Sequence, residues 1–354
     1  MTRLRCGPLQ TARPPREING LTVPPRYLRE APVPALSFAI PARRRTSGAS
    51  DSQSHIVLFN DERYQSWNLS PGQRLFRYDH YAGRRLVGTL SGVDDDGILD
   101  CGHSAPFGGI DWVRRREPVG SVVDLLRGAA AHARITGIRE LRLRGRPAYF
   151  GANETASEFA LLSLGAAVEA CEISLGIEVW RYPSPEAYIA ALGCSARNTL
   201  QHGRRAGMAF EPAETLADWA ACYELLAETK RRRGVQLKFS LDYLLGLREA
   251  FGTRIAMHRL RRNGELAGAA LVYRVSRDWD CVVAWGDNLS DRADKVMNAM
   301  VYELVRRAIA QGVAIIDLGI ASVDGVPDDG LIQFKRSVGG ITGLRSNFRL
   351  SVGR

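Results

Sequence analysis

The sequence predicts an α/β (α+β) protein that consists of two similar domains in succession. The chain has 354 residues, 45% of them apolar, which is a globular composition with enough length for two hydrophobic cores. Strands and amphipathic helices alternate clearly in the second half. Parts of that series recur in the first half at a nearly constant spacing. We therefore expect domains over residues 55–182 and 183–354, each with a sheet flanked by helices, behind an arm over residues 1–54.

The elements of the second half follow from hydrophobic periodicity. Residues 208–212 predict a strand, and the next segment predicts a helix with Leu216, Trp219 and Tyr223 on one face. A second helix is expected from Ser240, a residue type that is common at helix starts. The remaining elements are strands over 253–261, 266–276 and 280–286, a helix over about 293–311, a strand over 314–319, a short helix, and a strand over 344–352. The resulting order is β, α, α, β, β, β, α, β, α, β.

An internal repeat supports the two-domain prediction. The segments YAGRRLVGTL and RNGELAGAAL both predict a strand, a glycine turn and a strand, and their glycines Gly83 and Gly264 are 181 residues apart. Further along, both halves contain a helix, a glycine and a strand, with Gly137 and Gly312 separated by 175 residues. Two features in the same order at similar spacings indicate a duplicated domain.

Charge is distributed unevenly along the chain. The net charge is +10, and residues 1–50 contribute +7 of it through nine arginines and two glutamates. This arm is also rich in proline, which predicts an extended or disordered segment that could contact phosphates or simply be a solvated tail. The chain has only four lysines against 44 arginines, which we attribute to a GC-rich genome.

Several classes of protein are excluded by what the sequence lacks. No run of 18 apolar residues predicts a membrane-spanning helix, and the N-terminus lacks the apolar core of a signal peptide. Six cysteines and six histidines are scattered without metal-ligand spacing, which argues against a disulfide framework and a zinc site. No serine-hydrolase, P-loop or dinucleotide-binding motif occurs. We expect a cytoplasmic protein without membrane insertion, metal or cofactor.

One lysine is placed unusually. The stretch DDGLIQFKRSVGG, residues 328–340, predicts a short helix that starts at its aspartates and stops at its final glycines. Leu331, Phe334 and Val338 share one face of this helix. Lys335 lies on the same apolar face, although lysines usually place their ammonium in water.

The order of elements resembles the GNAT acyltransferase fold, and the tandem arrangement resembles the Fem-type aminoacyltransferases and their relatives. This resemblance covers roughly residues 55–350 and implies two GNAT-like domains, each a mixed and largely antiparallel sheet flanked by helices, the first of them degenerate. It implies transfer of an aminoacyl group from aminoacyl-tRNA to an amine acceptor that is bound between the domains. The segments that carry it are GLIQFK (330–335), DLGIASVDG (317–325), HSAPFGGI (103–110), and Arg197 and Arg204 in RNTLQHGRRAG (197–207).

The expected donor follows from a missing motif. GNAT enzymes that use acetyl-CoA hold its pyrophosphate on a glycine-rich loop at the start of their long helix. Here no glycine occurs between Gly286 and Gly312, and Asp287, Asp291 and Asp294 flank the helix start. A donor other than CoA, such as aminoacyl-tRNA, therefore fits better. Two alternatives stay open: an acyl-CoA enzyme with an atypical pyrophosphate site, and a non-catalytic scaffold that binds RNA or protein.

Acyl transfer needs a stabilised oxyanion and a deprotonated amine, and two residues are candidates for these roles. Lys335 could stabilise the oxyanion in a semi-apolar pocket, and the resemblance implies that it contacts the donor acyl group; alternatively its ammonium extends to solvent. Asp317 ends a strand and could accept a proton or orient the amine, or it could cap the following turn.

Other residues are candidates for binding the substrates. Arg197 and Arg204 could hold an anionic acceptor or form a solvated helix face. Residues 230–234 (KRRRG) are attributed to the negative end of a helix dipole. The acceptor, a small molecule or peptide with an amine, and the oligomeric state are left open. Each remaining candidate could instead be structural, as core or turn residues: Phe334, Trp285, Asn298, Tyr302, His103, Phe107 and Gly108.

Overall fold

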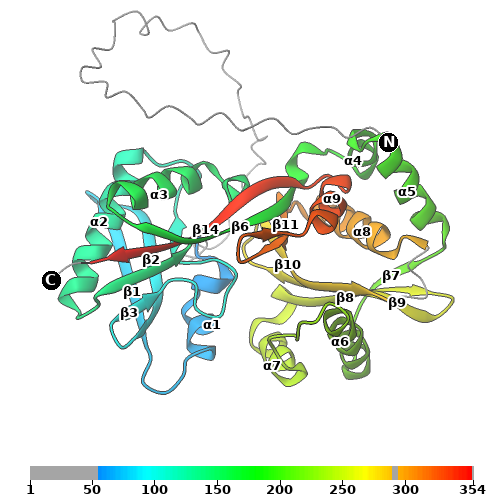
Figure 1. Cartoon of the computed structure of the whole chain (residues 1–354), viewed down its shortest axis with the longest axis horizontal. Coiled ribbons are helices and arrows are strands. Elements are labelled where there is room, and N and C mark those ends of the chain that lie inside the picture. Colours follow the sequence, from blue (N-terminus) through cyan, green and yellow to red (C-terminus); the bar gives the residue numbers. More distant parts are fainter. Residues whose placement is uncertain (1–54, 289–293, 353–354) are drawn as a thin grey trace, which may run out of the picture. The chain divides into compact units, whose positions relative to one another are not determined.

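The computed structural model describes residues 55–288 and 294–352, which belong to one compact unit (Figure 1). The predicted arm over 1–54 and Asp291 lie outside the described residues. Of the helices in the described part, none combines the length and apolar character that crossing a membrane requires.

The first half of the described chain contains six strands and three α-helices. Its elements are α1 (Glu62–Trp67), β1 (Arg74–Ala82), β2 (Arg85–Asp95), β3 (Ile98–Asp100), β4 (Ile110–Trp112), α2 (Val119–Ile135), β5 (Glu140–Arg144), α3 (Ala152–Ser163) and β6 (Ala167–Glu178). A short 3-10 helix, Ala148–Phe150, lies between β5 and α3.

The second half follows the predicted order, with two additional helices at its start and two additional short strands before its last helix. Its elements are α4 (Pro185–Ala191), α5 (Cys194–Arg205), β7 (Ala209–Pro212), α6 (Leu216–Arg231), α7 (Leu241–Phe251), β8 (Ile255–Arg262), β9 (Glu265–Arg274), β10 (Trp279–Asp287), α8 (Val296–Gln311), β11 (Ile315–Ile320), β12 (Ser322–Val323), β13 (Val326–Pro327), α9 (Asp329–Ser337) and β14 (Ile341–Ser351). The sequence predicts α5 only as a possible solvated helix face for Arg197 and Arg204, and not in the order of elements, because α5 lacks an apolar stripe: Leu200 and Gly203 are its buried residues.

The internal repeat is present in three dimensions, which confirms the predicted fold class. Gly83 and Gly264 form the turns of the β1–β2 and β8–β9 hairpins, and Gly137 and Gly312 follow α2 and α8. All four glycines have positive φ, as such turns and helix ends require. The parallel pairs repeat at the same spacings, because β3 pairs with β5 over Ile98–Asp100 and β10 pairs with β11 over Trp279–Cys281.

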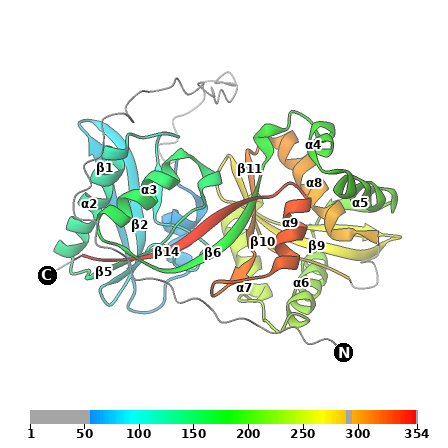
Figure 2. The ribbon, with the colours of Figure 1, turned by 45° about the horizontal axis from the view of Figure 1, so that its top comes forward.

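The two halves share one twelve-stranded sheet because they exchange their last strands. Strand β6 of the first half pairs with β11 of the second, and β14 of the second half pairs with β5 of the first. The two exchanged strands also pair with each other antiparallel, from Ile341 opposite Gly176 to Arg349 opposite Ala167. Figure 2 shows these two long strands running together between the halves. Strand β14 begins at Ile341, three residues earlier than predicted, because its first residues complete this ladder.

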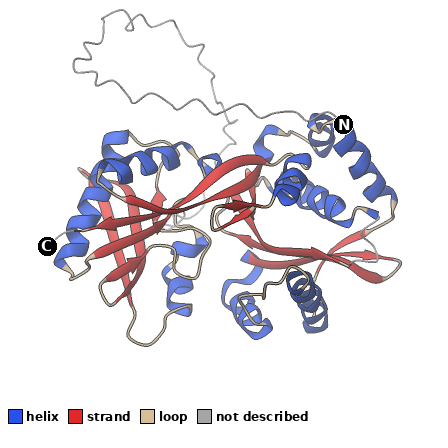
Figure 3. Cartoon of the chain, viewed as in Figure 1, coloured by secondary structure: helices blue, strands red, loops and turns tan. Residues whose placement is uncertain are grey.

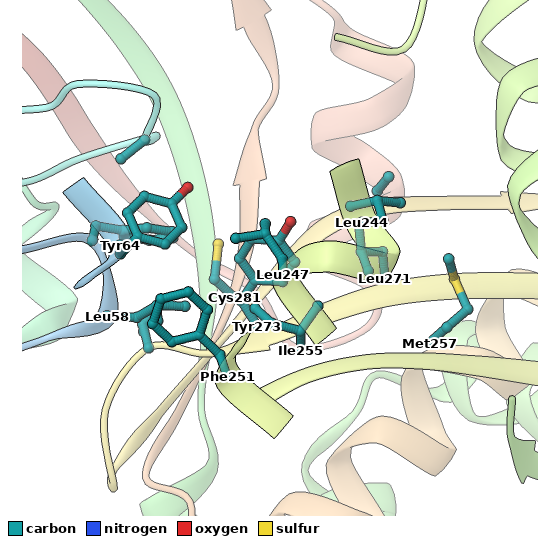
Figure 4. Packing of buried hydrophobic residues seen from close by; sticks show 14 of the residues in the cluster. Leu58, Tyr64, Leu244, Leu247, Phe251, Ile255, Met257, Leu271, Tyr273 and Cys281 are labelled. Atoms are coloured by element: carbon teal, nitrogen blue, oxygen red, sulfur yellow. The ribbon is translucent and has the colours of Figure 1, made fainter. Parts of the chain in front are cut away.

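Helices cover both faces of the second half of the sheet, with α6 and α7 on one face and α8 on the other (Figure 3). The core under α6 and α7 extends into the first half, as Figure 4 shows. There Leu58 and Tyr64 of the first half belong to the same buried cluster as Phe251, Tyr273 and Cys281 of the second. The exchanged strands and this common core join the halves into one body.

Two glycines at the exchange allow an aromatic ring to lie against the backbone. A Cβ at Gly176 on β6 would lie 2.6 Å from Cε2 of Tyr149, and a Cβ at Gly343 on β14 would lie 3.0 Å from Cδ1 of the same ring. Tyr149 is buried, so it has little room to move away.

We predict that Gly176→Ala destabilises the protein by about 1–3 kcal/mol, the usual cost of overpacking a core. The matched control is Gly120→Ala in the first turn of α2, where nothing lies within 4 Å of the added Cβ. Urea unfolding monitored by circular dichroism measures both free energies. Equal midpoints for the two variants would contradict the proposed contact.

Candidate active site

Strands β10 and β11 part in the middle of the second half. They pair in parallel over Trp279–Cys281 and Ile315–Asp317 only. Beyond this point β10 continues beside β9, while β11 continues beside β6 with a register shift between Asp317 and Ile320. Two strands that diverge in this way leave backbone groups on their facing edges without partners in the sheet.

Lys335 lies at this opening. Its Nζ donates hydrogen bonds to the carbonyl oxygens of Gly319 (2.9 Å) and Ile320 (2.8 Å) on β11. The same Nζ is 5.9 Å from the ring centroid of Trp285 on β10. The ammonium therefore faces both strands beyond the point where they part. An ammonium has three N–H donors, so one of them has no partner within the described chain.

Lys335 is only 1% exposed, which excludes the alternative that its ammonium extends to solvent. Burial lowers the pKa of Lys335 to about 7; the negative charge of Asp317 raises it, and repulsion by the nearby cations, among them Arg345, lowers it further. The buried face of α9 consists of Ile332 and Lys335, and the C-cap residue Val338 is buried beyond them. The sequence prediction centred this face on Leu331 and Phe334, which are half-buried and flank it.

Asp317 is fully buried beside the opening and accepts bonds from both halves of the chain. Its Oδ1 accepts from Tyr149 Oη (2.7 Å), Ser174 Oγ (3.4 Å) and Gly319 N (3.1 Å), and its Oδ2 accepts from an Arg345 guanidinium nitrogen (2.9 Å) and Cys281 Sγ (3.4 Å). The bond to Gly319 is the turn cap that the sequence suggested. A carboxylate with this many donors is suited to positioning its neighbours more than to accepting a proton.

The donors around Asp317 were missed by the sequence analysis. Burial and the charge of Asp317 raise the pKa of Tyr149 well above its usual value, so this hydroxyl remains a donor. Arg345 comes from β14, and its Nε is buried without a hydrogen-bond partner among the described residues. Its guanidinium lies 5.5 Å from the ring centroid of Phe107, which belongs to the HSAPFGG turn of the first half. Arg345 thus connects that turn to the Lys335 site.

The predicted binding residues lie in three places: beside Lys335, at the contact between α5 and α8, and in the HSAPFGG turn of the first half. Phe334 packs edge-on against Trp285, with ring centroids 5.8 Å apart, so both lie beside Lys335. Arg204 lies 4.6 Å from the ring centroid of Tyr302, where α5 packs on α8. Arg197 and Asn298 belong to the same two helices: a guanidinium nitrogen of Arg197 donates to Cys194 Sγ (3.2 Å), and the Asn298 backbone N donates to Lys295 O (3.0 Å).

The first-half turn is held by its own contacts. His103 Nε2 lies 3.0 Å from Asn68 O and its Nδ1 lies 3.7 Å from Asp100 Oδ2. A Cβ at Gly108 would lie 2.7 Å from Cys101 O, so this glycine is needed for close packing of the turn. Phe107 alone of the predicted turn residues has a described contact that leads to the Lys335 site, through Arg345.

The start of α8, where a CoA enzyme would hold pyrophosphate, has α5 packed beside it and an exposed Lys295 at its N-cap. A Cβ at Gly203 of α5 would lie 3.1 Å from Lys295 O and 3.4 Å from Ala299 Cβ, which places α5 directly against the first turn of α8. The Asp294 carboxylate at this helix start lies 2.5 Å from an Arg262 guanidinium nitrogen and 3.9 Å from His202 Nε2. An acidic side chain therefore already lies at the positive end of the helix.

Two hollows occur away from Lys335. One is a cavity of about 20 Å³ beside Arg146 and Glu154, large enough for about one water molecule. The other, of about 590 Å³, is lined by residues that include Arg63 and Trp67. Within the described chain, no group of three or more His, Cys, Asp or Glu residues could hold a metal ion.

We predict that Arg345→Met destabilises the protein by about 3–5 kcal/mol, because it leaves the Asp317 carboxylate buried without its counter-charge. Adding Asp317→Asn should recover part of this loss. The control is Arg349→Met on the same strand, whose ion pair with Glu169 is half-exposed and should contribute less than about 1 kcal/mol. Denaturant unfolding of the wild type and these three variants measures the free energies, and a loss below 1 kcal/mol for Arg345→Met would contradict the prediction.

Comparisons with known proteins bear on the fold. Residues 195–336 match the family model described as "Acetyltransferase (GNAT) domain". The solved structure of FemX superposes with a TM-score of 0.65 at 10% identity, covering 86% of this chain and 96% of that one. A conserved protein of unknown function from Bacteroides thetaiotaomicron gives a TM-score of 0.52 at 15% identity, covering 85% and 96%.

L-PGS from Bacillus licheniformis gives a TM-score of 0.51 at 11% identity, covering 80% of this chain and 85% of that one. Identities this low show a common fold alone. No curated protein gives a significant match to the sequence. The matched segment thus contains a GNAT domain, the whole chain has a fold similar to that of FemX, and together these findings support an acyltransferase enzyme.

Proposed function

We propose that this enzyme transfers an aminoacyl group from aminoacyl-tRNA to the amine of an acceptor that binds between its two halves. The observation that carries the proposal is the buried Lys335 ammonium at the opening between β10 and β11, with one N–H donor left over. A fixed cation in a site of low dielectric stabilises a developing oxyanion much better than a cation in water.

The reaction proceeds by attack on an ester. The nitrogen of the acceptor amine attacks the carbonyl carbon of the aminoacyl ester, and the carbonyl oxygen becomes an oxyanion beside Lys335. The ester C–O bond then breaks as the oxyanion collapses, and an amide remains. The ribose oxygen leaves with the proton that the attacking amine loses. Asp317, saturated with hydrogen bonds, would hold Gly319 in place while the residues around Lys335 shift to admit the carbonyl.

The acidic residue and missing glycine at the start of α8 support a donor without a CoA pyrophosphate. The helix start has Asp294 beside it and α5 packed against it, and its sequence has no glycine to let the backbone approach a phosphate closely. The Fem-type resemblance of the GLIQFK segment supports an aminoacyl ester on tRNA as the donor.

Acyl-CoA is the second candidate donor, because the matched family model is described as an acetyltransferase domain. The two candidates are separated by incubating the protein and a set of amines with charged tRNA or with acyl-CoA, and detecting new amides by mass spectrometry. Transfer from charged tRNA supports the proposal. Transfer from acyl-CoA alone would overturn it.

We predict that Lys335→Met lowers kcat about 10²–10³-fold, the usual loss when one oxyanion donor is removed. The matched control is Arg336→Gln, the next residue of α9, which is exposed and contacts Thr342. Transfer assays should show near-normal activity for the control, and circular dichroism should show that both variants are folded. Normal turnover of Lys335→Met would exclude the assigned role.

We also predict a pH dependence. Because the pKa of Lys335 is lowered to about 7, its ammonium is present below pH 7 and is lost as pH rises through that value. A guanidinium stays charged throughout, so the ratio of kcat/KM between the wild type and Lys335→Arg should fall above pH 7. Titration of the acceptor amine cancels in this ratio. A ratio that rises with pH would indicate that neutral Lys335 acts as a base.

A further inference from the structure

Several cations at the end of α6 have no counter-charge among the described residues. The segment KRRRGVQLK, residues 230–238, holds five positive side chains and no acidic one. Arg231 pairs with Glu228, and a guanidinium nitrogen of Arg232 donates to Asp287 O at 2.7 Å. In residues 55–288 and 294–352, the three remaining side chains form neither an ion pair nor a hydrogen bond: Lys230, Arg233 and Lys238.

These three side chains, here called the basic cluster, lie close to Lys335. The end of α6 is fixed to the end of β10, since Thr229 Oγ1 lies 3.5 Å from Asp287 O, and Arg232 donates to the same oxygen. Trp285, two residues earlier on β10, faces the Lys335 ammonium. Lys230 and Arg233 are near enough that their repulsion helps to lower the pKa of Lys335, and Arg233 and Lys238 act in the same way on Lys230.

Lysines are concentrated around this site, although the chain otherwise uses arginine for most of its basic residues. It uses arginine for 44 of its 48 basic residues, yet three of its four lysines gather here: Lys230, Lys238 and Lys335. The acid that favours the charged form of Lys335 is Asp317, which already pairs with Arg345. Like charges brought together without a counter-ion repel one another, and an anion between them would remove that cost.

We propose that the basic cluster binds a phosphate group of the donor and so places the adjacent acyl carbonyl at Lys335. This inference rests on the proposed function and narrows its donor. In an aminoacyl ester of a nucleotide, about six covalent bonds separate the carbonyl carbon from the nearest phosphorus, whereas in acyl-CoA about fourteen do. A phosphate site within the electrostatic reach of Lys335 matches the shorter connection.

The test uses a hydrolysis-resistant probe, 3′-deoxy-3′-alanylamido-adenosine, with and without a 5′-phosphate. Isothermal titration should show that the wild type binds the phosphorylated probe about ten- to hundredfold more tightly, as hydrogen bonds to charged groups imply. The triple variant Lys230→Gln, Arg233→Gln, Lys238→Gln should lose this preference. Arg231→Gln, which removes a neighbouring cation paired with Glu228, should keep it. Thermal unfolding of each variant checks the fold.

Further measurements separate this inference from the proposed function. Coenzyme A is titrated as a second phosphate source, and its binding should not depend on the basic cluster. No phosphate preference in the wild type, or loss of CoA binding alone in the triple variant, would overturn the phosphate site. Transfer from charged tRNA is assayed separately. If the wild type prefers the phosphorylated probe but shows no transfer, the proposed function is overturned and the phosphate site is supported. If it shows transfer but no such preference, the proposed function is supported and the phosphate site is overturned.

Discussion

The buried ion pair between Arg345 and Asp317 fixes the part of the molecule on which the candidate site depends. Two charged groups removed from water are tolerated only when each has its partner and further hydrogen bonds. Here the pair joins β14 to β11, and Tyr149 of the first half adds a third contact. The Asp317 carboxylate also receives the N–H of Gly319, whose carbonyl oxygen accepts from Lys335. Each of these bonds orients the next, so the lysine is positioned by contacts that neither half makes alone.

The electrostatic consequence is a site with an excess of positive charge. Asp317, a carboxylate that favours the charged form of Lys335, already pairs with Arg345, while the end of α6 adds further cations nearby. Burial alone would favour the neutral amine, and Asp317 alone would favour the ammonium. Their balance leaves Lys335 near its titration point at neutral pH. A polyanionic donor would shift this balance toward the ammonium, so binding and oxyanion stabilisation would be coupled through charge.

The sequence predicts much of this fold because local signals are strong. Hairpins around Gly83 and Gly264 and the helix ends at Gly137 and Gly312 depend on turn chemistry between neighbours in sequence, and all lie where predicted. Lys335 stood out because a lysine on an apolar helix face is a local conflict, and the aromatic residues Phe334 and Trp285 lie beside it.

The rest depends on long-range pairing that leaves no local pattern. Arg345 is one of 44 arginines, and its role arises only because β14 crosses to the first half. Tyr149 meets Asp317 across 168 positions of sequence for the same reason. Residues 230–234 were attributed to a helix dipole, since nothing in residues 230–238 shows that the end of α6 lies near α9.

The two halves differ at an equivalent place, the point where a short parallel pair of strands ends. In the first half β3 and β5 also pair in parallel over three residues, but Gly108 N then donates to Arg144 O, so the HSAPFGG turn closes the gap. Gly165 follows α3 and Gly339 follows α9, so these two glycines are equivalent positions of the two halves. Lys335 precedes Gly339 by four residues, and the residue at the same distance before Gly165 is Leu161, a buried core residue. An apolar side chain and a packed turn leave no cation for an acyl carbonyl there. The framework is thus present in both halves, but only the second half, among the described residues, combines an opening with a buried ammonium. The proposed chemistry therefore lies in that half, and the first half contributes Tyr149 and Phe107 to the contacts around it.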